Sequence, residues 1–315
     1  MHLDRFVALL VAMTHPSVSP LSATSMLSPI ILFTAVINGL MTGAVYALVA
    51  LGLTLIYGVL HIINFAHGAL LSAALFAAFF AFQKLGLDPY LAAFLIAPAF
   101  FVLGYGLQRL VIGPASHGDD RNMLLVTLGL AVLIENALLY AFHADTRTID
   151  LAYGFKSVNL GFTFIALPRL ISFAAVFVVA LALWLIMALT DTGKAIRAVA
   201  KEKLGAQLAG IDVAHIYAVT FGLGTACVAI AACLLIPTYY ANPRAGNAFV
   251  LVAFTIVVLG GMGSVPGALI GGLLIGVVES LAGFYFGESL GQVGIFLIFI
   301  AVLLLRPRGL FGASA

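Results

Sequence analysis

The chain has 315 residues, of which 63% are hydrophobic and only 8% are charged, and its mean hydropathy is +1.20. A soluble domain is about half apolar and a quarter charged, so too few polar side chains remain here to cover a water-exposed surface. The formal net charge of +2 is too small for a nucleic-acid-binding protein. These values exclude soluble, disordered and disulfide-scaffold chains and indicate an integral membrane protein.

Residues 1–28 precede the first long apolar stretch. They contain a short apolar patch, residues 6–13, that cannot span a bilayer. We expect a poorly ordered extension, or a signal-like segment with a break near Ala23; Met26 is an alternative start. Residues 29–312 are expected to form one transmembrane domain.

The apolar runs are continuous and about 20 residues long, the length of a helix that crosses a ~30 Å hydrocarbon core. Strands of a membrane barrel would alternate in polarity instead. The sequence therefore predicts an all-α polytopic bundle of about eight to ten spans. The first run is too long for one straight crossing and is compatible with two short helices. The expected spans are residues 30–59, 66–84, 90–112, 122–142, 170–190, 214–240, 247–262, 266–286 and 290–305.

The basic residues in short loops predict the orientation, because Lys and Arg are enriched on the cytoplasmic side. The loop after Thr190 carries four of them, the C-terminal tail two, and Arg109 and Arg121 flank the 113–121 loop, whereas Arg147, Lys156, Arg169 and Arg244 would lie outside. Placing these three regions in the cytoplasm leaves 143–169 as the longest external loop.

No enzyme signature is present. The sequence contains no H-E-x-x-H, no G-x-S-x-G and no Cys/His cluster at metal-ligand spacing. Gly193-Lys194 lacks the other residues of a phosphate-binding loop, so the chain itself is not expected to bind ATP. Cys227 and Cys233 are six residues apart in one apolar run and cannot pair within a helix. We expect no catalytic residue, metal or cofactor.

Polar side chains inside apolar spans are costly and often functional. A break between the first two spans either lines a translocation path or is a turn that bonds its own backbone. Carboxylates within later spans are either path or gate residues, or they take part in interhelical hydrogen bonds, or they are neutral. The candidates are Asn64, Phe65 and His67 in the break, Glu135 and Asn136, and Glu279.

Glycines occur inside the spans at a spacing of four. Such small-x3-small faces let two helix backbones approach closely. They predict helix packing, either within this chain or against another subunit. The pairs are Gly39 and Gly43, Gly267 and Gly271, and Gly272 and Gly276.

Residues 191–212 form the long charged stretch between two spans. Thr190, Asp191 or Thr192 can cap a helix start, and Gly210 can end it. The pattern predicts one short amphipathic helix over 193–210, which either anchors to anionic lipid or docks on a cytoplasmic partner. Its basic face carries Lys194, Arg197 and Lys201, and its apolar contacts are expected from Ala198, Leu204, Ala206 and Leu208.

Several segments together resemble one family. The run from Thr192 to Ala198, with Ala206 and Gly210-Ile211-Asp212, looks like a cytoplasmic coupling loop. Residues 38–68, ending in Ile63-Asn64-Phe65-Ala66-His67-Gly68, resemble an amino-terminal signature, and residues 260–272 resemble a carboxy-terminal one. The Arg306–Gly312 tail is also similar. The family is that of the permeases of branched-chain amino acid ABC importers of the LivH/LivM type, in the LivH branch.

The resemblance implies a multi-pass permease of a bacterial inner membrane with several partners. These are a second related permease, two cytoplasmic ATPase subunits and a periplasmic substrate-binding protein that delivers an amino acid. The resemblance also implies that the loop docks in a groove of an ATPase and transmits the closure of the ATPases to the membrane spans. The coupling residues would be Gly193, Lys194, Arg197, Ala198, Glu202, Ala206 and Gly210.

Other functions stay open at this stage. Related permeases carry urea, short amides or aromatic acids. A secondary transporter driven by an ion gradient would use Glu135 and Glu279 as proton sites. A membrane enzyme or receptor is opposed by the missing catalytic spacings and by the lack of a large soluble sensor region.

Overall fold

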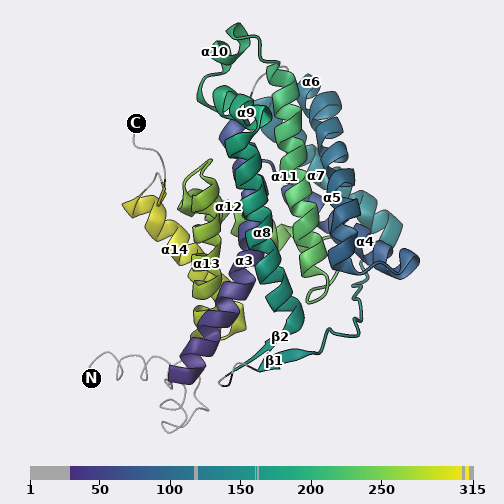
Figure 1. Cartoon of the computed structure of the whole chain (residues 1–315), viewed down its shortest axis with the longest axis vertical. Coiled ribbons are helices and arrows are strands. Elements are labelled where there is room, and N and C mark those ends of the chain that lie inside the picture. Colours follow the sequence, from purple (N-terminus) through teal and green to yellow (C-terminus); the bar gives the residue numbers. More distant parts are fainter. Residues whose placement is uncertain (1–28, 117–119, 160, 162, 307–308, 312–315) are drawn as a thin grey trace.

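The computed structural model describes residues 29–116, 120–159, 161, 163–306 and 309–311, so the 1–28 segment lies outside the described part. The described chain is a bundle of helices (Figure 1). The predicted all-α membrane bundle is confirmed, and each expected span coincides with a helix. Seven are long and apolar enough to cross a membrane: α3 (Pro29–Leu60), α4 (Ala66–Leu85), α5 (Pro89–Gly106) with its continuation, α7 (Asp120–Phe142), α8 (Leu167–Leu189), α11 (Val213–Leu235) and α13 (Val265–Phe286).

The remaining elements are shorter. The continuation of α5 is a π-helical turn, η1 (Leu107–Ile112), followed by α6 (Gly113–Ser116). Two further apolar helices are α12 (Ala245–Gly260) and α14 (Glu288–Leu305), and the link after α8 forms α9 (Asp191–Lys201) and α10 (Lys203–Leu208). Two short strands, β1 (Ser157–Asn159) and β2 (Phe164–Ala166), pair antiparallel in the long loop before α8.

The first apolar run is one helix and not two. α3 has 32 residues. At 1.5 Å per residue this is about 48 Å, longer than the ~30 Å core, so the helix must tilt or project beyond the bilayer. No Gly-Pro or Pro break interrupts it, which explains why the helix continues. The β1–β2 hairpin was not predicted, because strands of three residues leave no periodic signal.

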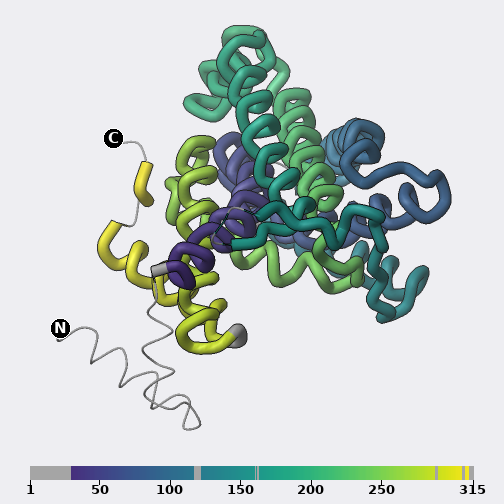
Figure 2. The backbone as a smooth tube through the Cα atoms, turned by 60° about the horizontal axis from the view of Figure 1, so that its bottom comes forward, coloured from purple at the N-terminus to yellow at the C-terminus, as the bar shows by residue number. Residues whose placement is uncertain are grey.

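The helices form three groups in space. α3, α8 and α11 run through the middle, α13 and α14 lie on one flank, and α4, α5 and α7 lie on the other (Figures 1 and 2). α9 and α10 sit at one end of the bundle, and the β1–β2 hairpin sits at the opposite end (Figure 1). We call these the α9 end and the hairpin end.

Local signals set the helix boundaries. Gly86 has a left-handed φ of 64° and ends α4, its N–H donating to the carbonyls of Ala81 and Phe82. Asp88 then starts α5 by accepting a hydrogen bond of 2.9 Å from the backbone N–H of Tyr90. Ser264 caps α13 in the same way. The turns between spans are therefore fixed by short-range chemistry.

Backbone contact between α3 and α13 forms the centre of the packing. Gly39 and Gly43 of α3 face Gly272 and Gly276 of α13. A Cβ atom on Gly43 would lie 2.6 Å from the carbonyl oxygen of Gly272, closer than side chains allow. The other glycine pair lies nearby: Gly267 faces Gly260 at the turn from α12, and Gly271 packs against Leu259 and Ile256 of α12.

The outer helices present apolar side chains outward. α5, α7, α8 and α14 each expose several large ones, and lipid or another membrane subunit can cover such surfaces. Examples are Phe94, Leu110, Leu125, Val178 and Leu304.

We expect Gly43→Ala to destabilise the protein, because the new methyl group forces α3 away from α13. Overpacking of this kind costs about 1–3 kcal/mol. The thermal midpoint of the purified protein in detergent should fall, whereas Gly129→Ala, at a helical glycine with open space around its Cα, should leave it unchanged. Equal midpoints for the two variants would show that the α3–α13 contact is not tight.

Candidate functional site

The charged segment after α8 is two helices, so the prediction of one helix over 193–210 is wrong. α9 ends at Lys201 and α10 begins at Lys203, with Glu202 between them in an extended conformation (φ −155°, ψ 105°). The Glu202 carboxylate caps α10 by accepting a hydrogen bond of 3.2 Å from the backbone N–H of Leu204. Of the three expected starts, Thr190 is the N-cap of α9, and its hydroxyl accepts from Gly193 N–H at 3.0 Å.

The break changes which side chains are buried. Ile196, Val199 and Ala206 are buried, whereas Leu204 is 63% and Leu208 is 83% exposed, and Ala198 is also exposed. Three of the four expected apolar contacts are therefore wrong. The chain changes direction at Glu202, so positions after it no longer share a face with positions before it.

α9 lies across the ends of three membrane helices with its charges outward. It contacts α3, α8 and α11. Its Val199 lines a cavity of about 390 Å³ together with Leu60 of α3. Lys194 and Arg197 are exposed on the opposite side, and Lys201, also exposed, borders the cavity. The Lys194 ammonium donates a hydrogen bond of 2.9 Å to Asp191 and lowers the pKa of that carboxyl below its usual value.

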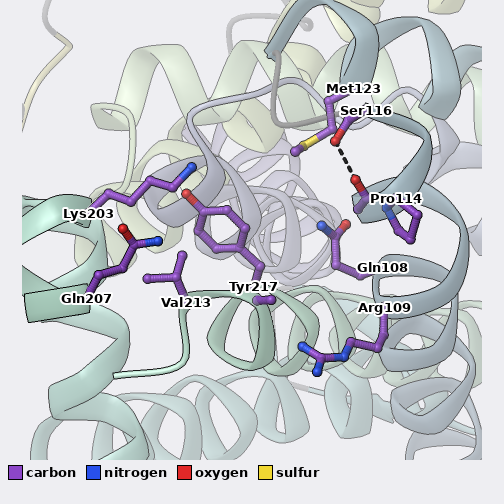
Figure 3. Close-up of a pocket in the computed structure, with 11 residues that line it drawn as sticks. Gln108, Arg109, Pro114, Ser116, Met123, Lys203, Gln207, Val213 and Tyr217 are labelled. Carbon is purple, nitrogen blue, oxygen red and sulfur yellow. Dashed lines mark hydrogen bonds between the residues drawn. The ribbon is translucent and has the colours of Figure 1, made fainter. Parts of the chain in front are cut away.

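α10 borders a further pocket at the α9 end, with a volume of about 440 Å³. Figure 3 shows Lys203 and Gln207 of α10 across from Gln108 of η1, with Tyr217 of α11 between them. The Lys203 ammonium lies 5.6 Å from the centre of the Tyr217 ring. Gln108 is 2% exposed, and its Oε1 has no hydrogen-bond partner among the described residues. The pocket can therefore accept a hydrogen-bonding group from outside the chain.

The break between α3 and α4 is buried. Asn64 and His67 are fully buried, and Phe65 is exposed. Asn64 Oδ1 accepts from Ala66 N–H at 3.0 Å, and His67 Nε2 donates to the Val49 carbonyl at 2.9 Å. Asn64 Nδ2 and His67 Nδ1 have no partner in the described part of the chain. In this conformation His67 joins α4 to α3, and Asn64 bonds the backbone of its own turn. The place of the two side chains on a translocation path stays a prediction.

Glu135 is held by an ion pair between helices. Its Oε1 lies 2.8 Å from Nε of Arg244, at the start of α12, and its Oε2 accepts from Asn247 Nδ2 at 3.3 Å. The neighbouring Asn136 is exposed and donates to the Val132 carbonyl of its own helix at 2.8 Å. Glu135 therefore ties α7 to α12, the interhelical alternative that the sequence left open.

Glu279 lies at a cavity between α3, α8 and α13. Its Oε1 accepts a hydrogen bond of 3.2 Å from the Tyr46 hydroxyl. The cavity has a volume of about 320 Å³, and we call it the polar cavity because Asn38, Ser280 and Glu279 line it. It adjoins a second cavity of about 280 Å³, which we call the apolar cavity for the side chains of Met41, Val45, Leu234, Leu235 and Phe249 in its walls. Ser172, Thr238 and Tyr239 also line it. Thr42, Tyr46 and Arg169 line both.

Apart from Glu279, the residues that line these cavities were not predicted as residues of a translocation path. Asn38, Thr42 and Tyr46 recur every four residues and so lie on one face of α3. Thr34 extends the row by one turn. A row of polar residues at helical spacing in an otherwise apolar span is the signal that could have found the site. Arg169 carries no local signal, since its relation to α3 depends on tertiary structure.

An α-helical bundle of this hydropathy, with polar cavities between its spans and a basic segment across one end, defines a multi-pass membrane transport protein. The chain belongs to the family described as "Branched-chain amino acid transport system / permease component", which matches residues 35–305. The family resemblance read from the sequence is thereby confirmed. No solved structure matches the chain.

Named relatives agree with this assignment. The high-affinity branched-chain amino acid transport system permease protein BraD of Pseudomonas aeruginosa is 34% identical over 294 residues, 88% of this chain and 94% of its own. The corresponding LivH of Escherichia coli K12 is 32% identical and covers 87% and 94%. The probable LivH of Methanocaldococcus jannaschii is 30% identical and covers 85% and 88%.

We expect Glu135→Gln to leave transport largely intact, because the observed partner of Glu135 is a fixed cation and not a proton path. The variant keeps a hydrogen-bonding side chain for Asn247 and loses only the ion pair, a cost of about 1 kcal/mol or less for a partly exposed pair. Solute uptake into vesicles, compared with Arg244→Gln, measures this. Loss of uptake in Glu135→Gln but not in Arg244→Gln would instead give the carboxylate a role of its own in transport.

Proposed function

We propose that the chain is the membrane permease subunit of an ATP-driven importer for branched-chain or related amino acids. In this proposal it pairs with a second, related permease, and two ATPase subunits bind beneath the pair. A periplasmic binding protein delivers the amino acid from the other side. The similarity to the BraD and LivH permeases over most of the chain supports the substrate class.

The construction of α9 is the observation that carries the docking role. An amphipathic helix that only anchored to lipid would direct its apolar face into the bilayer. Here Ile196 and Val199 are buried inside the protein, so the exposed basic face is left to meet a partner. Arg197 has no ion-pair partner among the described residues, which makes its charge available to an acidic groove.

The same segment supports the orientation. With the α9 end in the cytoplasm, its basic residues obey the positive-inside tendency and the β1–β2 hairpin faces the periplasm. The protein then lies in the bacterial inner membrane, where ATPases and a binding protein reach opposite ends of one bundle. The pocket beside α10 would receive part of the same cytoplasmic partner.

The contacts from α9 to α3 and from α3 to α13 can transmit a movement of the ATPases into the membrane. α9 rests on the end of α3, and α3 is in backbone contact with α13. Closure of the ATPases that shifts α9 would therefore shift α3 and α13 with it. This is rigid-body alternating access, which requires that the ATPases contact the two membrane states differently.

An ion-gradient mechanism is less well supported. It would rely on Glu135 and Glu279 as proton sites, yet Glu135 is paired with Arg244. It would also leave the exposed basic face of α9 without a role. An importer for urea, short amides or aromatic acids differs only in solute and would use the same α9 contact.

Arg197→Glu should uncouple ATP hydrolysis from uptake, because it places a carboxylate against an acidic partner groove. Loss of a charged contact and the added repulsion weaken the binding of α9 to the ATPase by about 2–5 kcal/mol. Uptake should therefore fall by more than tenfold. Reconstituted transporter with its binding protein measures both activities. Lys84→Glu makes the same charge change at the exposed end of α4 and should have little effect. Unchanged uptake in Arg197→Glu would exclude α9 as the contact.

A further inference from the structure

The two adjoining cavities carry opposite charges on different helices. Arg169, the third residue of α8, donates a hydrogen bond of 3.4 Å from Nη1 to Asn38 Oδ1. Glu279 on α13 accepts one from Tyr46. Both partners belong to the polar row of α3, and within the described residues neither charge is in an ion pair. A carboxylate and a guanidinium thus border one space without neutralising each other directly.

Arg169 is exposed at the first turn of α8, whereas Glu279 is partly buried on α13. Charged side chains within a membrane bundle normally pair with each other or mark a solute path. Arg169 and Glu279 are both at the polar cavity but bond neutral groups, an amide and a phenol. A solute that carries both charges can satisfy both side chains at once.

The second cavity defines the rest of that solute. The apolar cavity shares Thr42, Tyr46 and Arg169 with the polar one. It continues between the apolar side chains of Met41, Val45, Leu234 and Leu235, and Ser172, Thr238 and Tyr239 also line it. Phe249 closes it with its ring 5.7 Å from that of Tyr46. A solute with its charges at Arg169 and Glu279 would therefore place an uncharged side chain against aliphatic and aromatic walls.

We infer that these cavities form a binding site on the path of a zwitterionic amino acid with an apolar side chain. Arg169 binds the α-carboxylate, which a guanidinium can hold with two parallel hydrogen bonds. Glu279 binds the α-ammonium, and Asn38 and Thr42 supply further hydrogen-bonding groups. The apolar cavity holds the side chain. The substrate class rests on the function proposed above, but the site itself does not require ATP-driven transport.

Cysteine protection tests the site directly. Thr42→Cys introduces a thiol that lines both cavities, and the native Cys227 and Cys233 are buried. Its rate of reaction with a charged methanethiosulfonate reagent is measured in the reconstituted transporter, with the parent protein as baseline. L-leucine at about ten times its dissociation constant should slow labelling about tenfold. Isopentylamine, which lacks the carboxylate, and 4-methylpentanoate, which lacks the ammonium, should protect far less.

Charge-removal variants identify the two charged contacts. Arg169→Gln and Glu279→Gln in the Thr42→Cys background should each raise the half-protecting leucine concentration about tenfold or more, because each loses a charged hydrogen bond. Lys156→Gln and Asp150→Asn remove exposed charges in the loop before α8 and should not change it. Ser157→Cys on β1 should label equally with and without leucine.

The outcomes separate this site from the proposed function. Leucine uptake by the transporter without protection of Thr42→Cys, or protection equal with the amine or the acid alone, would overturn the site. Failure of Thr42→Cys to react at all would overturn it too, since a solute path must be open to solvent in one state. Protection without ATP-driven uptake would keep the site and reject the importer.

Discussion

The contact between the backbones of α3 and α13 is the constraint on which the rest of the structure depends. Where Gly39 and Gly43 meet Gly272 and Gly276, no side chain separates the two helices. Lipid tails are as apolar as Leu, so helices in a bilayer gain little from hydrophobic burial and must associate through close packing. Glycines at a four-residue spacing provide that packing, and they leave α3 and α13 to behave as one unit.

This unit links the two ends of the molecule. At its α9 end, α3 supports the buried face of α9, including Val199. Further along, the same helix presents Asn38, Thr42 and Tyr46 to the cavities that Arg169 and Glu279 border. A displacement imposed on α9 therefore reaches the polar row without passing through a flexible loop. This continuity is the physical basis of the proposed coupling between ATP hydrolysis and solute movement.

Much of the fold could be predicted from sequence, because long apolar runs have one structural solution in lipid. The positions of the spans follow from hydropathy alone. The break at Glu202 was not predicted, since a Glu between two Lys is not a typical helix cap, although its carboxylate caps α10 here. The burial of Ile196 and Val199 against the membrane helices depends on tertiary packing. Likewise, nothing local to Glu135 indicates Arg244, 109 residues away. The cavities could not be predicted for the same reason, because residues far apart in the sequence line them. The row of polar residues on α3 at a spacing of four was nevertheless visible in the sequence.

The central claim is that α9 and α3 move as one body when the transporter binds ATP. Spin labels are attached at Lys201→Cys on α9 and at Ile31→Cys at the start of α3, both exposed positions. The distance between the two labels is measured in the assembled transporter by double electron–electron resonance. The account predicts that the separation between the two labels stays constant on ATP binding, while the distance from Ile31→Cys to a label on the partner permease changes. A change between the two labels as large as the change between the subunits would contradict it.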